Sequence, residues 1–445
     1  MKKTAAFLSL GCKVNSYETE AMRGMFEVAG YEIVDFKDIA DVYVVNTCTV
    51  TNIADRKSRQ MLRQAKKRNP DAIIVAVGCY VQAAEEKLVE DSAIDIIVGN
   101  NRKSEIVNLV EGFNNNSPIE EAVADINLER DYEELMVNAT AEKTRAFIKI
   151  QDGCNRFCSY CIIPYVRGRV RSRNEEDILT EIRGLVERGY QEVVLTGIHI
   201  SSYGSDRLEE GEQVETKLPL ATLIKKIGEI PGIERIRLGS LEPRIITEEF
   251  VQEIVKVRQF CPHFHLSLQS GSDTVLQRMN RKYSAQEYYE KVLLLKEHFI
   301  NPAFTTDIIV GFPGETEEEF KETLEFVKKI GFSHIHVFKY SKREGTKAAK
   351  MTDQIPDDIK GSRSNELIDL SELMSREYKS IFMGKIEQVL FEEEITVEGR
   401  RYQVGHNERY LKIALQSEED LTNQIKSVKI TGLLNNEILL CEISN

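Results

Sequence analysis

The stretch IQDGCNRFCSYCIIPYVRGR, residues 150–169, holds three cysteines within eight residues, Cys154, Cys158 and Cys161. It directly follows a short hydrophobic segment that is typical of a β-strand. Three thiolates at this spacing can hold three irons of a 4Fe-4S cluster, which leaves the fourth iron open to another ligand. A zinc site is the main alternative, but structural zinc sites normally close with four Cys or His ligands. Since only His199 is a candidate fourth ligand, the spacing favours a cluster.

The residues around this stretch, 145–341, alternate between strand-like and helix-like patterns. The predicted strands are Phe147–Ile150, Glu192–Leu195, Arg235–Leu238, Phe264–Leu268, Thr305–Val310 and His334–Tyr340. The predicted helices are Glu175–Arg188, Leu220–Ile230, Thr247–Val257, Asp273–Phe299 and Thr316–Ile330. Six consecutive βα units favour a partial (βα)6 barrel similar to a TIM barrel, in which chemistry takes place at the carboxyl ends of the strands. Another open parallel sheet is the alternative.

A second group of cysteines lies in the N-terminal region, where strands and helices also alternate. The predicted strands are Thr4–Leu10, Asp41–Asn46, Ala72–Val77 and Asp95–Val98, and the helices are Asn15–Val28, Ala54–Arg68, Val81–Leu88 and Lys103–Val110. This order predicts a doubly wound parallel sheet. Cys12, Cys48 and Cys79 each follow one of the first three strands. Ligands bind outside the carboxyl ends of such strands, so the three thiols are expected to converge and to permit a second cluster with an open iron.

The remaining segments complete a predicted organisation of three domains and one linker. Residues 113–139 read as an acidic linker, because Ile119–Glu134 contains seven acids against one arginine. Residues 371–445 hold five short alternating runs that predict a small all-β barrel or sandwich. The predicted domains are therefore an N-terminal domain at 1–112, the linker at 113–139, a central α/β core at 140–370 and a β domain at 371–445.

Composition narrows the class of protein. The chain has 445 residues with 59 Lys plus Arg against 72 Asp plus Glu, a net charge of −13. That balance argues against indiscriminate coating of nucleic acid, whose affinity comes from many phosphate contacts. No apolar run approaches the roughly 20 residues of a membrane span, and the N-terminus makes a poor signal peptide. The eight cysteines are sparse for a disulfide framework. A cytoplasmic enzyme with free thiols and no membrane segment is expected.

The Cys-x3-Cys-x2-Cys stretch resembles the motif of the radical S-adenosylmethionine (SAM) enzymes. The resemblance implies that SAM chelates the open iron and is cleaved, after one-electron reduction, to methionine and a 5′-deoxyadenosyl radical. Four further segments resemble the strand ends of that family: LTGIHI at 195–200, LGSLEP at 238–243, LSLQSGS at 266–272 and TTDIIVGFPGET at 305–316. They make Gly197, Ser240, Gln269 and Asp307 plausible SAM contacts.

The two cysteine triads together resemble the methylthiotransferase family over nearly the whole chain. That family has a three-cysteine domain, a radical SAM core and a C-terminal TRAM domain, a small RNA-binding β-barrel. The resemblance implies two 4Fe-4S clusters, SAM as co-substrate, and insertion of a methylthio group into an unactivated C–H bond. It also implies an electron donor such as flavodoxin or ferredoxin, whereas the sulfur donor stays undefined. Nine basic against twelve acidic residues from Arg376 onward are an unusual balance for an RNA-binding barrel.

The family resemblance leaves three possible substrates. Two are tRNA adenosines that already carry an isopentenyl or a threonylcarbamoyl group, and the third is an aspartate of a ribosomal protein. NTCTVTNIADRKSRQ at 46–60 and YVRGRVRSR at 165–173 resemble the threonylcarbamoyl branch, which modifies carbon 2 of the adenosine beside the anticodon, at position 37. Alternating arginines share one face of an extended segment and can hold the threonylcarbamoyl carboxylate in a fork. We therefore predict that Arg167, Arg169, Arg171 and Arg173 bind substrate.

An alternative interpretation of another class remains: a non-catalytic iron–sulfur protein that binds RNA or carries electrons. It would leave the glycine-rich strand ends unexplained. Cys261 and Cys441 fall outside both triads and are interpreted as structural residues.

Overall fold

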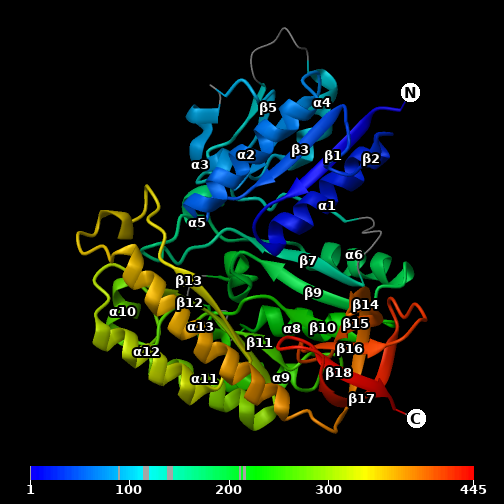
Figure 1. Cartoon of the computed structure of the whole chain (residues 1–445). Helices are drawn as coiled ribbons and strands as arrows, with labels where there is room; N and C mark the ends of the chain where they lie inside the picture. Colours follow the sequence, from blue (N-terminus) through cyan, green and yellow to red (C-terminus); the bar gives the residue numbers. More distant parts are fainter. Residues whose placement is uncertain are drawn as a thin grey trace.

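The computed structural model describes residues 2–88, 91–113, 120–137, 144–209, 212–213 and 217–444. Figure 1 shows an N-terminal α/β unit above a central α/β unit, with a small β-barrel at the lower side where the C-terminus lies. This α/β architecture, with a doubly wound sheet, a partial barrel and an all-β C-terminal part, confirms the fold class that the sequence predicts. Among the described residues no helix has both the length and the apolar character that a membrane span needs.

The N-terminal unit is a six-stranded sheet in the order β2-β1-β3-β4-β5-β6, and every neighbouring pair is parallel. Its strands are β1 (Thr4–Ser9), β2 (Glu32–Val34), β3 (Val42–Thr47), β4 (Ile73–Gly78), β5 (Ile96–Val98) and β6 (Glu120–Ala122). Its helices are α1 (Lys13–Val28), α2 (Asn52–Arg68), α3 (Cys79–Leu88) and α4 (Ile106–Gly112). Buried side chains cover both faces of the sheet, which explains why β3 and β4 read as continuous apolar runs.

The central unit forms an open barrel of six parallel strands, as the βα alternation predicts. The strands are β7 (Arg145–Asp152), β9 (Glu192–Gly197), β10 (Arg235–Leu238), β11 (His263–His265), β12 (Ala303–Val310) and β13 (His334–Lys339). They form sheets in the orders β10-β9-β7-β8 and β11-β12-β13, where β8 (Arg171–Ser172) is a short antiparallel strand. Isolated bridges such as Leu241 with Leu266 join the two sheets. No described strand closes the barrel between β13 and β8.

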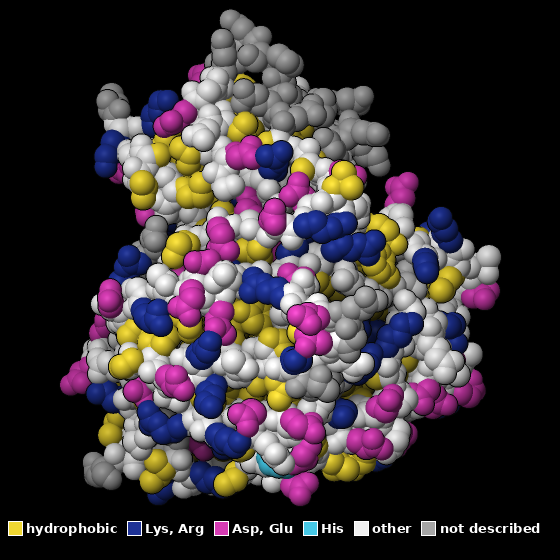
Figure 2. Space-filling model, turned by 180° about the vertical axis from the view of Figure 1, so that it is seen from behind, with side chains coloured by type: hydrophobic (Ala, Val, Ile, Leu, Met, Phe, Trp, Pro, Cys, Tyr) yellow, Lys and Arg dark blue, Asp and Glu magenta, His cyan; other side chains and the backbone are white. Residues whose placement is uncertain are grey.

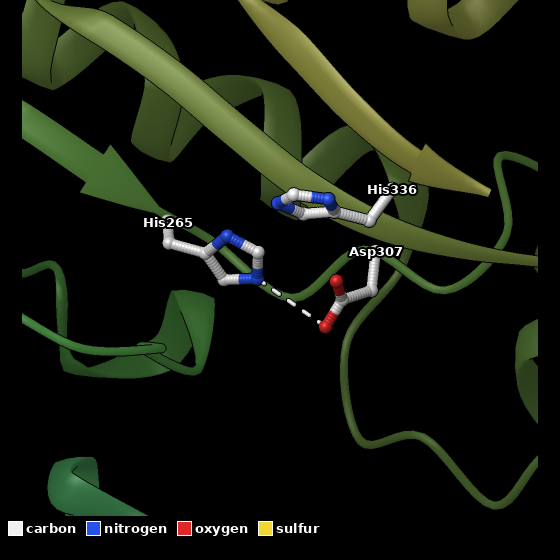
Figure 3. Close-up of side chains that lie close together, drawn as sticks. All are labelled: His265, Asp307 and His336. Atoms are coloured by element: carbon white, nitrogen blue, oxygen red, sulfur yellow. Dashed lines mark ion pairs between the residues drawn. The ribbon is translucent and has the colours of Figure 1, made fainter. Parts of the chain in front are cut away.

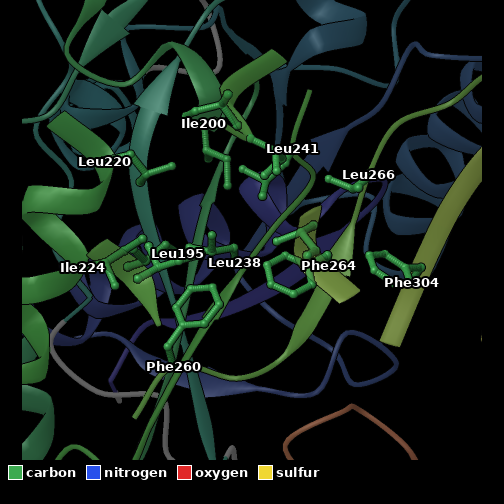
Figure 4. Packing of buried hydrophobic residues seen from close by; sticks show 14 of the residues in the cluster. Leu195, Ile200, Leu220, Ile224, Leu238, Leu241, Phe260, Phe264, Leu266 and Phe304 are labelled. Carbon is green, nitrogen blue, oxygen red and sulfur yellow. The ribbon is translucent and has the colours of Figure 1, made fainter. Parts of the chain in front are cut away.

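Helices cover the outside of this barrel and enclose the largest core of the molecule. They are α6 (Glu175–Glu187), α8 (Pro219–Gly228), α9 (Glu248–Ile254), α10 (Asp273–Arg278), α11 (Ala285–His298), α12 (Glu317–Ile330) and α13 (Asp357–Ser380). The short helix α5 (Ile163–Val166) lies instead between this barrel and the N-terminal unit (Figure 1). Figure 4 shows Leu195 of β9 and Leu238 of β10 packed beside Leu220 and Ile224 of α8. The single helix predicted for residues 273–299 is in fact two, because the chain turns between α10 and α11.

The C-terminal unit is a closed five-stranded barrel that packs against the amino ends of the central strands. Its strands are β14 (Ile386–Val397), β15 (Arg400–His406), β16 (Lys412–Gln416), β17 (Ile425–Leu433) and β18 (Leu439–Ile443), in the order β14-β15-β16-β18-β17. Arg237 of β10 donates to the Glu408 carbonyl at 2.9 Å, and Arg145 of β7 pairs with Glu392 at 3.0 Å. The barrel thus leaves the carboxyl ends of the central strands free.

Two domain boundaries in the structure differ from those predicted from the sequence. Strand β6 extends the N-terminal sheet beyond residue 112, and α13 runs across the boundary predicted at 370/371. The predicted linker at 113–139 lies partly outside the described residues. Its described end is packed, because Leu135 and Val137 are buried with Tyr17 of α1, and the Tyr17 hydroxyl donates to the Leu135 carbonyl at 2.5 Å.

Candidate functional site

The loop that carries Cys154, Cys158 and Cys161 connects β7 with α5 at the carboxyl end of the barrel. Gly153 begins this loop with a positive φ of 71°, and a Cβ there would lie 1.7 Å from the Arg169 carbonyl oxygen. Only glycine therefore allows the chain to turn at this point. The Cys154 amide donates to the Gly168 carbonyl at 3.0 Å, so the two ends of the loop are fixed to each other.

The three thiols suit the cluster that the motif predicts. All three are half-buried, and burial raises the pKa of Cys154 to about 11 and that of Cys161 to about 12. Such thiols stay protonated at neutral pH until a metal displaces the proton. The Arg281 guanidinium lies 3.3 Å from Cys158 Sγ, and the Arg156 amide lies 3.4 Å from Cys154 Sγ. N–H groups directed at thiolate sulfur are a normal second shell of an iron–sulfur cluster.

A buried carboxylate beside this loop was missed by the sequence analysis. Glu242 follows β10, forms an ion pair with Arg156 at 2.6 Å and is hydrogen-bonded to His199 Nε2 at 2.8 Å. Burial favours the neutral acid, but the hydrogen bond from His199 and the charges of His199 and Arg156 lower the pKa of Glu242 to about 2. The side chain is therefore an anion that orients Arg156 of the cluster loop.

The four residues predicted to contact SAM lie on four successive strands or just after them. Gly197 ends β9, and a Cβ there would lie 2.9 Å from the Gln151 carbonyl, so close strand packing already requires glycine. Ser240 is exposed after β10, and Gln269 has a φ of 72° after β11. Asp307 lies within β12, inside the strand predicted at Thr305–Val310. The SAM contacts of these four residues stay predictions.

The second triad lies at the carboxyl ends of three adjacent strands. Cys12 precedes α1, Cys48 follows β3, and Cys79 is the first residue of α3. Gly11 precedes Cys12 with a φ of 101°, and a Cβ on it would lie 2.9 Å from Cys48 Sγ. Gly78 precedes Cys79 with a φ of 96°. These glycines turn the chain sharply at the strand ends. The thiols of Cys79 and Cys12 lie near enough to Cys48 to raise its pKa, and their role as cluster ligands stays a prediction.

A buried group of charged side chains lies beneath the second triad. Arg167 Nε donates to Cys79 Sγ at 3.2 Å, and its Nη1 lies 2.8 Å from Glu18 and 3.0 Å from Asp152. Two lysines complete the group: Lys149 lies 2.7 Å from Glu18, and Lys103 lies 3.4 Å from the same carboxylate. With three bases and two acids the group carries a net positive charge. A positive environment suits a site whose thiolates are negative.

Both triads belong to one interface between the N-terminal and central units. Ile162 directly follows Cys161 and, with Val166 of α5, packs against Cys79. Helix α5 therefore joins the two cysteine sites, as Figure 1 shows by its position between the units. Arg343 from the loop after β13 clamps the same interface, because it donates to Thr49 at 2.7 Å, next to Cys48, and pairs with Asp55 at 2.6 Å.

The structure buries three of the four arginines that are predicted to bind substrate, and their role in binding stays a prediction. Arg167 follows α5, and only Arg171 lies in a strand, so the segment is not extended throughout. Arg167, Arg171 and Arg173 are buried, and Arg173 pairs with Glu181 of α6. Arg167 and Arg173 are ion-paired with carboxylates of the protein, whereas Nε and Nη2 of Arg171 have no hydrogen-bond partner among the described residues. Arg169 alone is exposed.

Replacing Arg167 tests this structural role. We expect Arg167→Met to lower the free energy of unfolding by about 3–5 kcal/mol, because it leaves Glu18 and Asp152 buried with fewer partners. Arg169→Met, a change of the same shape at an exposed position, should alter it by less than about 0.5 kcal/mol. Urea denaturation under anaerobic conditions measures both. Equal urea midpoints for Arg167→Met and the wild type would refute the contribution of Arg167 to stability.

Comparisons with known proteins agree with this geometry. The Radical SAM superfamily model matches residues 148–327, and the model described as uncharacterized protein family UPF0004 matches residues 4–99. In the described chain the first range holds the Cys154 triad and the second holds the Cys12 triad. The structure of the radical SAM methyltransferase TsrM from Kitasatospora setae superposes with a TM-score of 0.56, covering 76% of this chain and 75% of that one at 15% identity. This likeness concerns the fold alone.

Curated relatives are much more similar in sequence. Threonylcarbamoyladenosine tRNA methylthiotransferase MtaB of Bacillus subtilis (strain 168) is 42% identical over 429 residues, which is 96% of this chain and 93% of the relative. The tRNA-2-methylthio-N(6)-dimethylallyladenosine synthase of Clostridium novyi (strain NT) is 39% identical over 391 residues, 86% of this chain and 84% of the relative. Fold and first triad define a radical SAM enzyme. The chain belongs to the radical SAM methylthiotransferase family, whose members use an iron–sulfur cluster and SAM.

Proposed function

We propose that this enzyme methylthiolates carbon 2 of threonylcarbamoyl-adenosine at position 37 of tRNA, with SAM and two 4Fe-4S clusters, by a radical mechanism. The observation that carries the proposal is the second triad, which meets the first across α5 in one interface. A one-cluster radical enzyme has no need of it. The threonylcarbamoyl substrate is supported by the name of the B. subtilis relative.

The bound cofactors would supply a 5′-deoxyadenosyl radical at the first triad and sulfur at the second. Cys154, Cys158 and Cys161 would hold the first cluster, and Cys12, Cys48 and Cys79 the second. Arg281 and Arg167 donate to the sulfur atoms of Cys158 and Cys79, so each triad has a guanidinium to stabilise the negative charge of its thiolates. No acid–base pair would be required, because the radical would remove the hydrogen of the substrate carbon.

An exposed aromatic and basic surface beside the first triad is the place where we expect the RNA to bind. The Arg169 guanidinium lies 4.6 Å from the centre of the Phe157 ring, which lies 5.7 Å from that of Tyr165. Tyr165 is 42% exposed. Bases of single-stranded RNA loops stack on such side chains. Figure 2 shows basic and acidic side chains mixed over the described part of the rear face, without an extended patch of one sign.

Replacing Tyr165 tests this surface. We expect Tyr165→Ala to raise the KM for tRNA about 10-fold, because one stacked base contributes about 1–3 kcal/mol. SAM cleavage without tRNA should be unchanged, since the described hydrogen bond and ring contact of Tyr165 are with Ile162 and Phe157. Tyr165→Phe keeps the ring and should retain the wild-type KM. Steady-state kinetics of the purified variants measure these values, and an unchanged KM for Tyr165→Ala would refute the stacking role.

The proposed reaction is tested by mass spectrometry of tRNA nucleosides after incubation with SAM and dithionite. We expect tRNA with threonylcarbamoyl-adenosine to gain one methylthio group. Two comparison substrates, tRNA with isopentenyl-adenosine and a ribosomal-protein peptide with the target aspartate, should stay unmodified. If one of these two comparison substrates is modified instead, the enzyme belongs to the branch of the family that acts on that substrate. Failure to form 5′-deoxyadenosine at all would favour a non-catalytic iron–sulfur protein. We infer that the enzyme acts in the cytoplasm, because its proposed substrate is tRNA and its proposed electron donor is flavodoxin or ferredoxin.

A further inference from the structure

Three potential metal ligands lie on the inner face of the barrel, outside both cysteine triads. They are His265 of β11, Asp307 of β12 and His336 of β13, drawn in Figure 3. Asp307 is the direct register partner of His336, and His265 is paired with Thr305, two residues before Asp307. Side chains two residues apart share one face of a strand. The sheet itself therefore holds the three groups together.

The distances between these side chains suit a metal ion. One ligand atom from each residue lies within 4.8 Å of the other two. His265 Nε2 and Asp307 Oδ2 are 3.3 Å apart. Ligands of a tetrahedral zinc ion, each about 2.0–2.1 Å from the metal, are separated by about 3.3 Å. Two of the three ligands thus already have the required separation, and the centre of the His336 ring lies 5.8 Å from that of His265.

The surroundings of His265 direct one ring nitrogen to the centre of the group. Its Nδ1 is hydrogen-bonded to the Thr305 hydroxyl at 3.0 Å, the usual second-shell contact of a metal-binding histidine. Its Nε2 is buried and makes no hydrogen bond within the described chain, since the contact with Asp307 lacks hydrogen-bond geometry. A buried nitrogen without a hydrogen bond is costly unless another ligand occupies it.

We propose that His265, Asp307 and His336 bind one divalent first-row transition-metal ion of the Zn²⁺ type. Two imidazoles and one carboxylate are a common ligand set for such ions. Asp307 is 31% exposed and His336 is exposed, so a fourth position is open towards the barrel interior. In this site Asp307 is a metal ligand and not the SAM contact that the sequence predicts. The proposal does not depend on the identity of the tRNA substrate.

Zinc binding by the reconstituted enzyme tests this site. Anaerobic protein with both clusters assembled is dialysed against Zn²⁺, and zinc and iron are counted by mass spectrometry. We expect the wild type to bind one zinc ion more than His336→Ala or Asp307→Asn, with the same iron content in all. Unchanged iron shows that the variants are folded and that zinc has not entered the cysteine sites. The matched control is His334→Ala, because the His334 ring makes an edge-to-face contact with His336, at 4.6 Å between ring centres, but lies outside the group.

Cobalt provides a second readout that identifies the ligands. Co²⁺ bound to the wild type should show electron spin echo modulation from histidine nitrogen, and this signal should be absent in His336→Ala and retained in His334→Ala. The proposal is overturned if the wild type binds no more zinc than His336→Ala, or if His334→Ala loses the ion as well. In either case His265 and Asp307 form an ordinary ion pair, and His336 is only a neighbour.

Discussion

A Cys48→Ala enzyme is expected to cleave SAM at the wild-type rate and to form no methylthiolated product, a loss of about a thousand-fold or more. Cys48 lies against Gly11 on the N-terminal sheet, and the described contacts of Cys154, Cys158 and Cys161 do not include it. Removing one of three ligands should therefore empty the second site and leave the first intact.

Paired assays of 5′-deoxyadenosine and methylthio-nucleoside on the same sample separate the two reactions. Iron should fall from about eight to about four per chain in Cys48→Ala. Cys441→Ala is the matched control, because Cys441 is also a buried cysteine but donates to the Ala414 carbonyl within the C-terminal barrel. It should retain both reactions. A Cys48→Ala enzyme that still made the product would disprove the role of the second triad.

A Cys158→Ala enzyme is expected to lose both reactions completely. Without Cys158 the first triad keeps two ligands, and Arg281 loses the sulfur to which it donates at 3.3 Å. SAM then has no cluster to reduce it, so 5′-deoxyadenosine should fall to the background level. The second triad is untouched, and about four irons per chain should remain.

The same paired assay measures this outcome. An Arg281→Lys enzyme serves for comparison, since it retains the three cysteines and should keep SAM cleavage at a reduced rate, by about 10- to 100-fold, as is usual for changes in the second shell of a metal site. Residual SAM cleavage by Cys158→Ala at the level of Arg281→Lys would contradict the assignment of the first triad.

Much of the fold could be predicted from the sequence because the strands are buried. The apolar runs before Cys12, Cys48 and Cys79 correspond to β1, β3 and β4, and strand order alone predicts that their carboxyl ends meet. The strands β2 and β6 have three residues each, and β6 consists of Glu-Glu-Ala, which carries no apolar signal. Such short edge strands form because they pair with a neighbouring strand. Their own sequences therefore carry little signal of a β-strand.

The arginine segment shows where sequence reasoning fails. Alternation at 167, 169, 171 and 173 suggests one exposed face, but burial of a charge depends on partners on other elements that only the fold brings near. Arg167 finds Glu18 on α1, and Arg173 finds Glu181 on α6. Neither contact has a local signal. Glu242 was missed for the same reason, although it lies within the LGSLEP segment that was singled out. The glycines before Cys12, Cys79 and Cys154 were the available signal of sharp turns.

The most direct test of the account is the iron and sulfide content of anaerobically purified wild-type protein, together with its Mössbauer spectrum. The account predicts about eight irons and eight sulfides per chain, in two 4Fe-4S clusters that each have one iron without a cysteine ligand. About four irons per chain in a single cluster, with Cys12, Cys48 and Cys79 present as free thiols, would contradict it.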